Sequence, residues 1–147
     1  MNVYIGMFLF AAVFPLLWLA IIFLISRLSG WASLASHYGT SQDLPKTHLK
    51  CRRILLRRIR FFPAQYGNIV TVSVDDEALY LSLIKIFGFG HEPLRVPFAD
   101  VKAEKNTGLF KRSAYLTFAR ENGITVIMSM NNLLWIEGER GKPFPAP

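Results

Sequence analysis

The sequence predicts an N-terminal transmembrane α-helix followed by a small, mainly β domain that closes with a C-terminal helix. Three observations support this fold class. Residues 3–26 carry no charged side chain, alternating apolar runs follow beyond residue 67, and the last apolar run has helical spacing behind a serine. A chain of 147 residues has room for about one such domain.

The first uncharged run predicts a membrane-spanning helix over residues 1–28. About 20 residues, at 1.5 Å each, cross a hydrocarbon core of roughly 30 Å. Pro15 lies near the middle, where membrane helices tolerate proline. A cleaved signal peptide is the alternative, because Ser33-Leu34-Ala35 resembles a cleavage site. Such a peptide would begin with positive charge and would have a shorter apolar run.

Positive charge is concentrated soon after this run. The formal net charge is +7, and one segment is basic without any acid: Lys46, Lys50, Arg52, Arg53, Arg57, Arg58 and Arg60. Basic residues near a membrane segment favour the cytoplasmic side. We therefore expect a single-pass protein of the inner (cytoplasmic) membrane, with its N-terminus outside and its C-terminal domain in the cytoplasm. The single Cys51 permits no internal disulfide, which is consistent with a reducing compartment.

Residues 29–47 are predicted to form an interfacial helix and a linker. Trp31, Leu34, Ala35 and Tyr38 fall on one stripe at helical spacing. Trp and Tyr favour the headgroup level of a membrane, so Trp31 and Tyr38 are the candidate membrane-interface residues. The short helix is expected either to lie at the interface or to fold back onto the domain.

Residues 48–140 are predicted to form the β domain. Alternating apolar residues in 68–74 and 78–84, joined by an acidic turn, predict one hairpin. The runs 113–119 and 124–128 predict a second, with Asn122-Gly123 in its turn, because Asn-Gly is the strongest short hairpin signal.

Shorter elements complete the predicted domain. Strands are expected at 94–97 and 101–105. Ser129 is expected to cap a helix whose apolar side carries Leu133, Leu134 and Ile136. Gly138 and a Pro-rich tail at 141–147 are expected to end it.

The basic stretch 50–62 is compatible with a strand or a helix, and its β-rich surroundings favour a strand. Its candidate contact residues for anionic lipid or a protein partner are Arg52, Arg53, Arg57, Arg58 and Arg60. Each exposed cation near an anionic leaflet contributes about 1 kcal/mol. The alternative is a solvated cluster that only sets topology. Loop 107–112 adds two apolar residues and two cations that suit an interface, namely Leu109, Phe110, Lys111 and Arg112.

Segment 87–98 is the stretch that most resembles a reaction site. Gly88 and Gly90 do not complete a phosphate-binding motif, and His91 and Glu92, adjacent on an extended segment, point to opposite sides. We interpret the segment as a structural turn in which His91 bonds a backbone carbonyl.

Other candidate chemistry is also incomplete. His48 and Cys51 are too few for a zinc site, and acidic turn 75–77 lacks the ligand number that calcium needs. The sequence predicts no enzyme activity, no cofactor and no metal, and it identifies no small-molecule substrate. The basic cluster lacks a nucleic-acid reader motif, so no nucleic-acid partner is expected.

One stretch, "LYLSLIKIFGFGHEPLRVPFADV", resembles the central signature of an uncharacterised family of small bacterial membrane-anchored proteins. The matching residues are Leu79, Tyr80, Leu81, Ser82, Gly90, His91, Pro93, Leu94 and Pro97, with Trp31, Leu34, Ala35 and Tyr38 upstream. Ala78 and Phe98 stand where that family usually has Gly and Trp. The resemblance implies membrane attachment and a small β domain, and it brings no assigned activity.

The order of the predicted elements is similar to that of bacterial pleckstrin-homology-like (PH-like) domains, although other small barrels or sandwiches give the same signals. Two functions follow as expectations. The favoured one is a membrane-anchored, non-enzymatic interaction module whose cytoplasmic β domain contacts a protein partner or an anionic lipid surface. The alternative is an accessory or structural subunit of a larger membrane protein complex, in which Trp18 and Phe23 pack against other helices.

Overall fold

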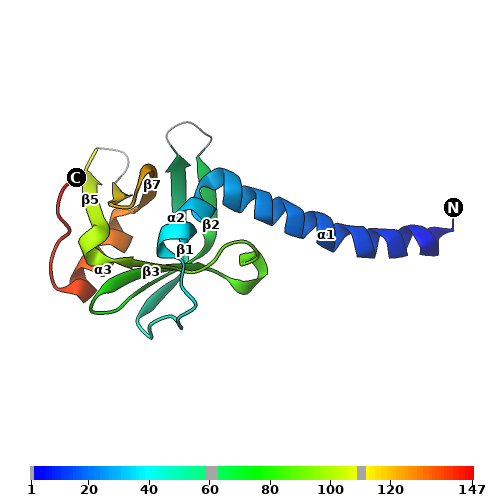
Figure 1. Ribbon diagram of the computed structural model, residues 1–147, viewed down its shortest axis with the longest axis horizontal. Helices are drawn as coiled ribbons and strands as arrows, with labels where there is room; N and C mark the ends of the chain where they lie inside the picture. Colours follow the sequence, from blue (N-terminus) through cyan, green and yellow to red (C-terminus); the bar gives the residue numbers. More distant parts are fainter. Residues whose placement is uncertain (1, 59–62, 109–111) are drawn as a thin grey trace.

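A long helix leads into a small β domain in the computed structural model, which describes residues 2–58, 63–108 and 112–147 (Figure 1). Helix α1 (Val3–Ser29) is the only helix in the described part of the chain that is long and apolar enough to cross a membrane. Most of it projects away from the β domain, and only its C-terminal end is packed: the buried residues are Ile22, Ser26 and Ser29.

A tight turn at Gly30 joins α1 to helix α2 (Trp31–Tyr38). Gly30 has φ +93°, and a Cβ atom there would lie 2.5 Å from Cδ1 of Ile124. Only glycine adopts this backbone conformation without strain and leaves room for the isoleucine. The chain therefore reverses at once from α1 onto the domain.

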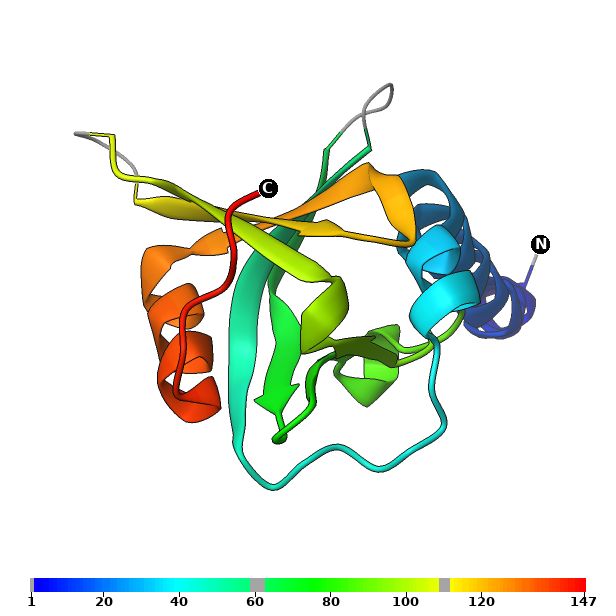
Figure 2. The same cartoon turned by 60° about the vertical axis from the view of Figure 1, so that its left-hand side comes forward.

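Within the described residues, seven strands form one antiparallel sheet in the order β4-β3-β2-β1-β7-β6-β5. They are β1 (His48–Arg58), β2 (Ala64–Val74), β3 (Ala78–Leu83), β4 (Leu94–Pro97), β5 (Val101–Asn106), β6 (Ser113–Phe118) and β7 (Glu121–Ser129). The sheet curls into a nearly closed barrel (Figure 2). With helix α3 (Met130–Arg140) at its end, the architecture confirms the predicted fold class.

Both outer edges of the sheet are partly covered. Beside β4, the backbone N–H of Thr40 donates to the carbonyl of Pro93 over 2.8 Å. Beside β5, the N–H of Ala103 donates to the carbonyl of Pro145 over 2.9 Å. These bonds occupy strand edges that would otherwise be open to pairing with another chain.

The first predicted hairpin is confirmed. Strands β2 and β3 pair from Val74↔Leu79 to Val70↔Leu83. The carboxylate of Asp75 accepts hydrogen bonds from the backbone N–H groups of Glu77 and Ala78, over 2.8 and 2.7 Å. An aspartate that bonds the backbone ahead of it stabilises such a turn.

The second hairpin is confirmed, but its predicted turn is wrong. The turn falls at Ala119 and Arg120, and Asn122-Gly123 lies inside β7. Neither of those two residues has a positive φ angle. The N–H of Ala119 donates to the carbonyl of Asp100 over 2.9 Å. This bond holds the chain at position 119, and the extra residues are absorbed by an irregular register beside Thr117.

Strand β1 shows that 48–58 is extended, as favoured for the basic stretch; residues 59–62 lie outside the described part.

In α3, the Ser129 hydroxyl accepts from the N–H of Asn132 over 3.3 Å, which confirms the predicted cap. The expected end at Gly138 is wrong, because α3 continues to Arg140 and stops at Gly141 with φ +76°. The prediction that Leu134 lies on the apolar side of this helix is wrong, because Leu134 is 52% exposed.

The core lies between the curled sheet and the two short helices. Trp31, Leu34 and Tyr38 of α2 belong to the same buried cluster as the inward side chains of the strands. Leu133 and Ile136 of α3 enter this cluster from the opposite side of the domain, as Figures 1 and 2 show. The packed unit therefore includes the α2 part of the segment predicted as interfacial helix and linker.

Candidate functional site

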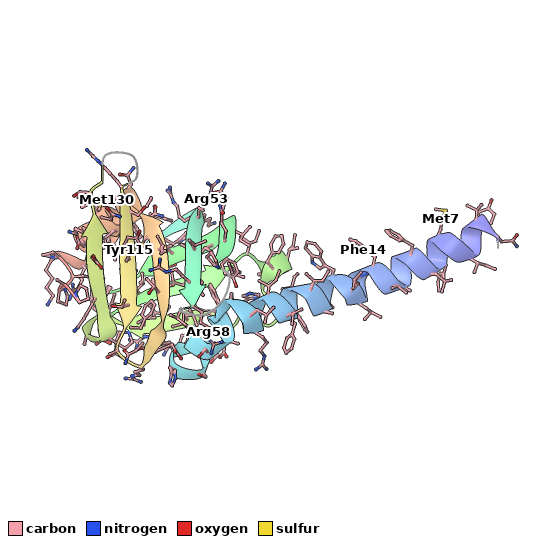
Figure 3. All side chains as sticks on the ribbon, turned by 90° about the horizontal axis from the view of Figure 1, so that it is seen from above. Met7, Phe14, Arg53, Arg58, Tyr115 and Met130 are labelled. Atoms are coloured by element: carbon pink, nitrogen blue, oxygen red, sulfur yellow. The ribbon has the colours of Figure 1, made fainter. Side chains whose placement is uncertain are left out.

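The outer face of strands β1, β7 and β6 carries exposed cations beside apolar surface. Arg53, Leu55 and Arg57 point outward from β1, because alternate residues of a strand share a face. Together with Ile127, Arg112 and Tyr115 they line an open groove of about 660 Å³, called the outer groove below. Figure 3 looks onto this face, with Arg53 and Tyr115 labelled.

The guanidinium groups of the outer groove have no carboxylate partner in the described part of the chain. The ion pairs in the described residues all involve other side chains. They join Arg95 to Glu77, Lys105 to Glu137, Arg120 to Asp100 and His37 to Glu121. Arg57 lies over the ring of Tyr115, with its Cζ atom 5.9 Å from the centroid. Such a contact stabilises the orientation of Arg57 while leaving its N–H groups available to an anion.

The predicted basic cluster is divided by the pleat of β1. Arg53 and Arg57 lie in the outer groove, and Arg112 joins them from the start of β6. Arg52 and Arg58 are half-buried. Arg58 packs beside the α1–α2 turn, where its Cδ atom would be 3.8 Å from a Cβ atom at Gly30. Of the other candidates, Arg60, Leu109, Phe110 and Lys111 lie outside the described residues.

Trp31 and Tyr38, the candidate membrane-interface residues, are buried inside the β domain. Trp31 has no exposed surface, and its indole N–H donates to the carbonyl of Glu92 over 2.9 Å. Tyr38 is buried, and its hydroxyl accepts from the N–H of Arg120 over 3.0 Å. The turn at Gly30 directs the stripe into the β domain, so the alternative in which the helix folds back onto the domain is correct.

A second group of polar residues joins the end of α1 to the domain. The Tyr66 hydroxyl on β2 lies 2.8 Å from Oγ of Ser29 and 3.0 Å from Nε2 of His91. Nδ1 of His91 lies 3.1 Å from the carbonyl of Phe89, which confirms the expected carbonyl contact. Since that carbonyl can only accept, Nδ1 carries the proton and Nε2 accepts from Tyr66.

Burial keeps this network uncharged near neutral pH. It lowers the pKa of His91 below its ordinary value of 6.5, against a smaller opposing effect of the bond to Phe89. Burial also raises the pKa of the Tyr66 hydroxyl to about 12, against a smaller opposing effect of the bond with Ser29. In the described residues no carboxylate bonds this imidazole, and the hydrogen bonds of the network join α1, β2 and the loop before β4.

An apolar cavity of about 150 Å³ lies beside the network. Ile22 and Ile25 of α1 line one side, and Ile69, Leu83 and Phe87 line the other.

In residues 2–58, 63–108 and 112–147, no three His, Cys, Asp or Glu side chains are grouped as metal ligands.

Sequence reasoning missed Tyr66 and Ser29, and it missed Ser26, whose hydroxyl donates to the carbonyl of Gly90. Their partners are remote: Tyr66 is 25 residues from His91 and 37 from Ser29. One local signal was available, because Ser26 and Ser29 are three apart at the end of an apolar helix and so share a face. That spacing indicates a polar contact on one side of α1.

No protein-family model matches the chain, and no curated protein matches its sequence. The resemblance to small membrane-anchored proteins therefore stays a prediction.

Proposed function

We propose that the protein is a membrane-anchored, non-enzymatic interaction module whose outer groove binds an acidic segment of a protein partner. In this proposal α1 spans the inner membrane with the N-terminus outside, and the β domain lies on the cytoplasmic side. The observation that carries the proposal is the grouping of Arg53, Arg57 and Arg112 around an apolar surface, without carboxylate partners among the described residues.

The chemistry of the outer groove indicates what it would bind. A guanidinium group presents a planar set of donors that matches a carboxylate in a two-bond arrangement. Between these cations, Leu55, Ile127 and Tyr115 are half-buried and offer apolar contact area. A segment that carries both acidic and apolar side chains would satisfy both parts of the groove, and Arg and Tyr are enriched where proteins bind one another.

The direction of the groove favours a protein over the bilayer surface. Figure 3 shows α1 running off to one side of the face that carries Arg53 and Tyr115. With α1 across the membrane, this face would look sideways, along the membrane plane, and not onto it. Arg58, at the turn next to α1, is better placed for a lipid headgroup.

The proposed topology is supported by charge. Arg27 occupies the last turn of α1, and no charged side chain precedes it in the helix. Cations at one end of a span favour the cytoplasmic side for that end.

A second candidate function is an accessory subunit of a membrane complex. The rings of Phe10 and Phe14 stack with centroids 5.4 Å apart, and those of Phe14 and Trp18 with centroids 6.4 Å apart. This aromatic stripe is exposed along α1 and would suit packing against other helices. The native mass of the protein in mild detergent would distinguish the two functions, because stable co-purifying subunits would support the accessory role.

The groove is tested with full-length protein in phosphatidylcholine nanodiscs and a fluorescein-labelled peptide containing glutamate and leucine. We expect binding that weakens as salt is added, because salt screens exposed charges. The Arg53→Gln/Arg57→Gln variant should bind at least about tenfold more weakly, a difference of about 1.4 kcal/mol. The matched control is Lys46→Gln/Lys142→Gln, which makes the same change in net charge at exposed positions outside the groove.

Equal weakening in both variants would contradict a specific groove. Binding of phosphatidylglycerol vesicles, but not of the peptide, through Arg53 and Arg57 would instead make the lipid surface the partner.

A further inference from the structure

Loop 84–90, between β3 and β4, exposes large apolar side chains next to α1. Ile86 is 71% exposed and Phe89 is 52% exposed. The Phe87 ring lies 5.6 Å from that of Trp18, and the Phe89 ring lies 6.3 Å from that of Phe23, between centroids. The apolar surface of the loop is therefore continuous with that of α1.

The loop is also fixed to the backbone of α1. The Ser26 hydroxyl donates a hydrogen bond to the carbonyl of Gly90. Gly90 has φ +71°, and a Cβ atom there would lie 3.0 Å from Cδ2 and 3.4 Å from Cα of Phe23. This approach requires glycine, both for the backbone angle and for the space. Loop 84–90 consequently lies beside the C-terminal part of α1, next to Phe23 and Ser26.

The depth of Phe87 follows from the length of α1. Crossing a hydrocarbon core of roughly 30 Å takes about 20 residues. A stretch of that length within Val3–Ser29 must end between residues 22 and 29, so it includes Trp18 wherever it begins. A ring in contact with Trp18 then lies at or below the boundary of the hydrocarbon. If Ile86 and Phe89 were instead left in water, they would form an unfavourable exposed apolar patch.

We propose that loop 84–90 is a second membrane-inserted element, with Ile86, Phe87 and Phe89 among the acyl chains of the leaflet at the C-terminal end of α1. This inference rests on the proposed anchoring role of α1. Lys85, exposed in the same loop, extends its amine towards the headgroups while its methylene stem lies along the apolar layer. The protein thus contacts the bilayer through a helix that crosses it and a loop that enters one leaflet.

The test uses nitroxide labels on the full chain in phosphatidylcholine vesicles. In a Cys51→Ser background, single labels are placed by Ile86→Cys, Phe89→Cys, Phe14→Cys and Leu134→Cys. Oxygen concentrates in the bilayer and a nickel chelate in water, so their relative relaxation effects report depth. We expect the labels at 86 and 89, like that at 14, to be more accessible to oxygen than to nickel, at a shallower depth than the label at 14. The matched control is Leu134, an apolar residue that is 52% exposed, like Phe89, but lies on α3; its label should be accessible to nickel.

The outcomes separate the two proposals. If the label at 14 is in lipid while those at 86 and 89 are as accessible to nickel as that at 134, the loop inference fails and the anchor stands. If the label at 14 is itself in water, the anchor fails. Shielding of 86 and 89 from both reagents would indicate a protein contact and would also overturn the inference.

A photocrosslinker avoids replacement of Cys51. Benzoylphenylalanine at position 86 should form adducts of phospholipid mass, as at position 14, and none should form at position 134. Absence of lipid adducts at 86, with adducts at 14, would contradict insertion of the loop.

Discussion

The hydroxyl of Tyr66 lies 3.0 Å from Nε2 of His91, and through this contact strand β2 holds the loop that precedes β4. The same hydroxyl lies 2.8 Å from Oγ of Ser29 at the end of α1. One phenol therefore joins three segments that are remote in sequence: a strand, a loop and the last turn of the apolar helix. All three polar atoms are in the interior, where each depends on the others for hydrogen bonding.

Replacing Tyr66→Phe should destabilise the fold by about 1 to 3 kcal/mol, because Nε2 of His91 would be left buried without its donor. Thermal unfolding of the detergent-solubilised protein, followed by circular dichroism, measures the change. The matched control is Tyr115→Phe, at a half-buried position in the outer groove. If the two variants melt at the same temperature, the hydroxyl of Tyr66 does not stabilise the junction.

Acid should weaken the fold through His91. Its pKa is lower in the folded protein than in the unfolded chain, whose histidines titrate at about 6.5. As the pH falls through that value, the unfolded state binds a proton that the folded state does not, so the free energy of unfolding decreases. The decrease stops once the pH is below the folded-state pKa. Urea unfolding across this range measures the slope.

The variant His91→Gln cannot titrate and should lose that part of the slope. His48→Gln, at an exposed position at the start of β1, is the control and should keep the wild-type profile. An unchanged slope in His91→Gln would show that another group is responsible.

Replacing two glycines by alanine should change the free energy of unfolding in opposite directions. Gly30→Ala should destabilise the protein by at least about 1 kcal/mol, because a left-handed conformation disfavours alanine and its methyl group would meet Ile124 at 2.5 Å. Gly138→Ala should stabilise it by roughly 0.5 to 1 kcal/mol, because Gly138 lies within α3 with nothing within 4 Å of a Cβ atom. Equilibrium unfolding checks both. Equal effects of one sign would contradict the geometry of the Gly30 turn.

The proposed topology predicts a cytoplasmic C-terminus. A cysteine added after Pro147, in a Cys51→Ser background, should resist a membrane-impermeant maleimide in intact cells and react after lysis. A cysteine placed before Val3 should react in intact cells. The reverse pattern would place the β domain outside and would contradict the positive-inside assignment.

Much of the fold could be predicted because its signals are local. The alternation in β2 and β3 follows from their half-buried pleat, and Ser129 caps α3 through a bond only three residues away. The Asn122-Gly123 turn failed because a longer-range contact, from Ala119 to Asp100, places the reversal earlier. The prediction that Leu134 shares the apolar side of α3 with Leu133 and Ile136 failed because neighbours on a helix are about 100° apart and face different ways.

The candidate sites could be predicted only in part. Alternation along β1 already separates Arg53 and Arg57 from Arg52 and Arg58, but which side is outward depends on the partners β2 and β7. The sequence could not distinguish burial of Trp31 and Tyr38 from a position on the membrane surface, since an amphipathic stripe suits a membrane surface and a protein core equally well. The contact of Phe87 with Trp18 joins residues on separate elements, so only the folded chain reveals it.

The turn at Gly30 leaves no slack between α1 and the domain. Only Gly30 separates α1 from α2, and Ser26 and Ser29 are bonded to atoms of the β domain, so we expect the helix and the domain to reorient together. If α1 spans the membrane as proposed, a change in the tilt of the helix, for instance in a thicker or thinner bilayer, would rotate the arginine face through the same angle. Bilayer thickness would thereby govern which neighbouring molecules that face can reach.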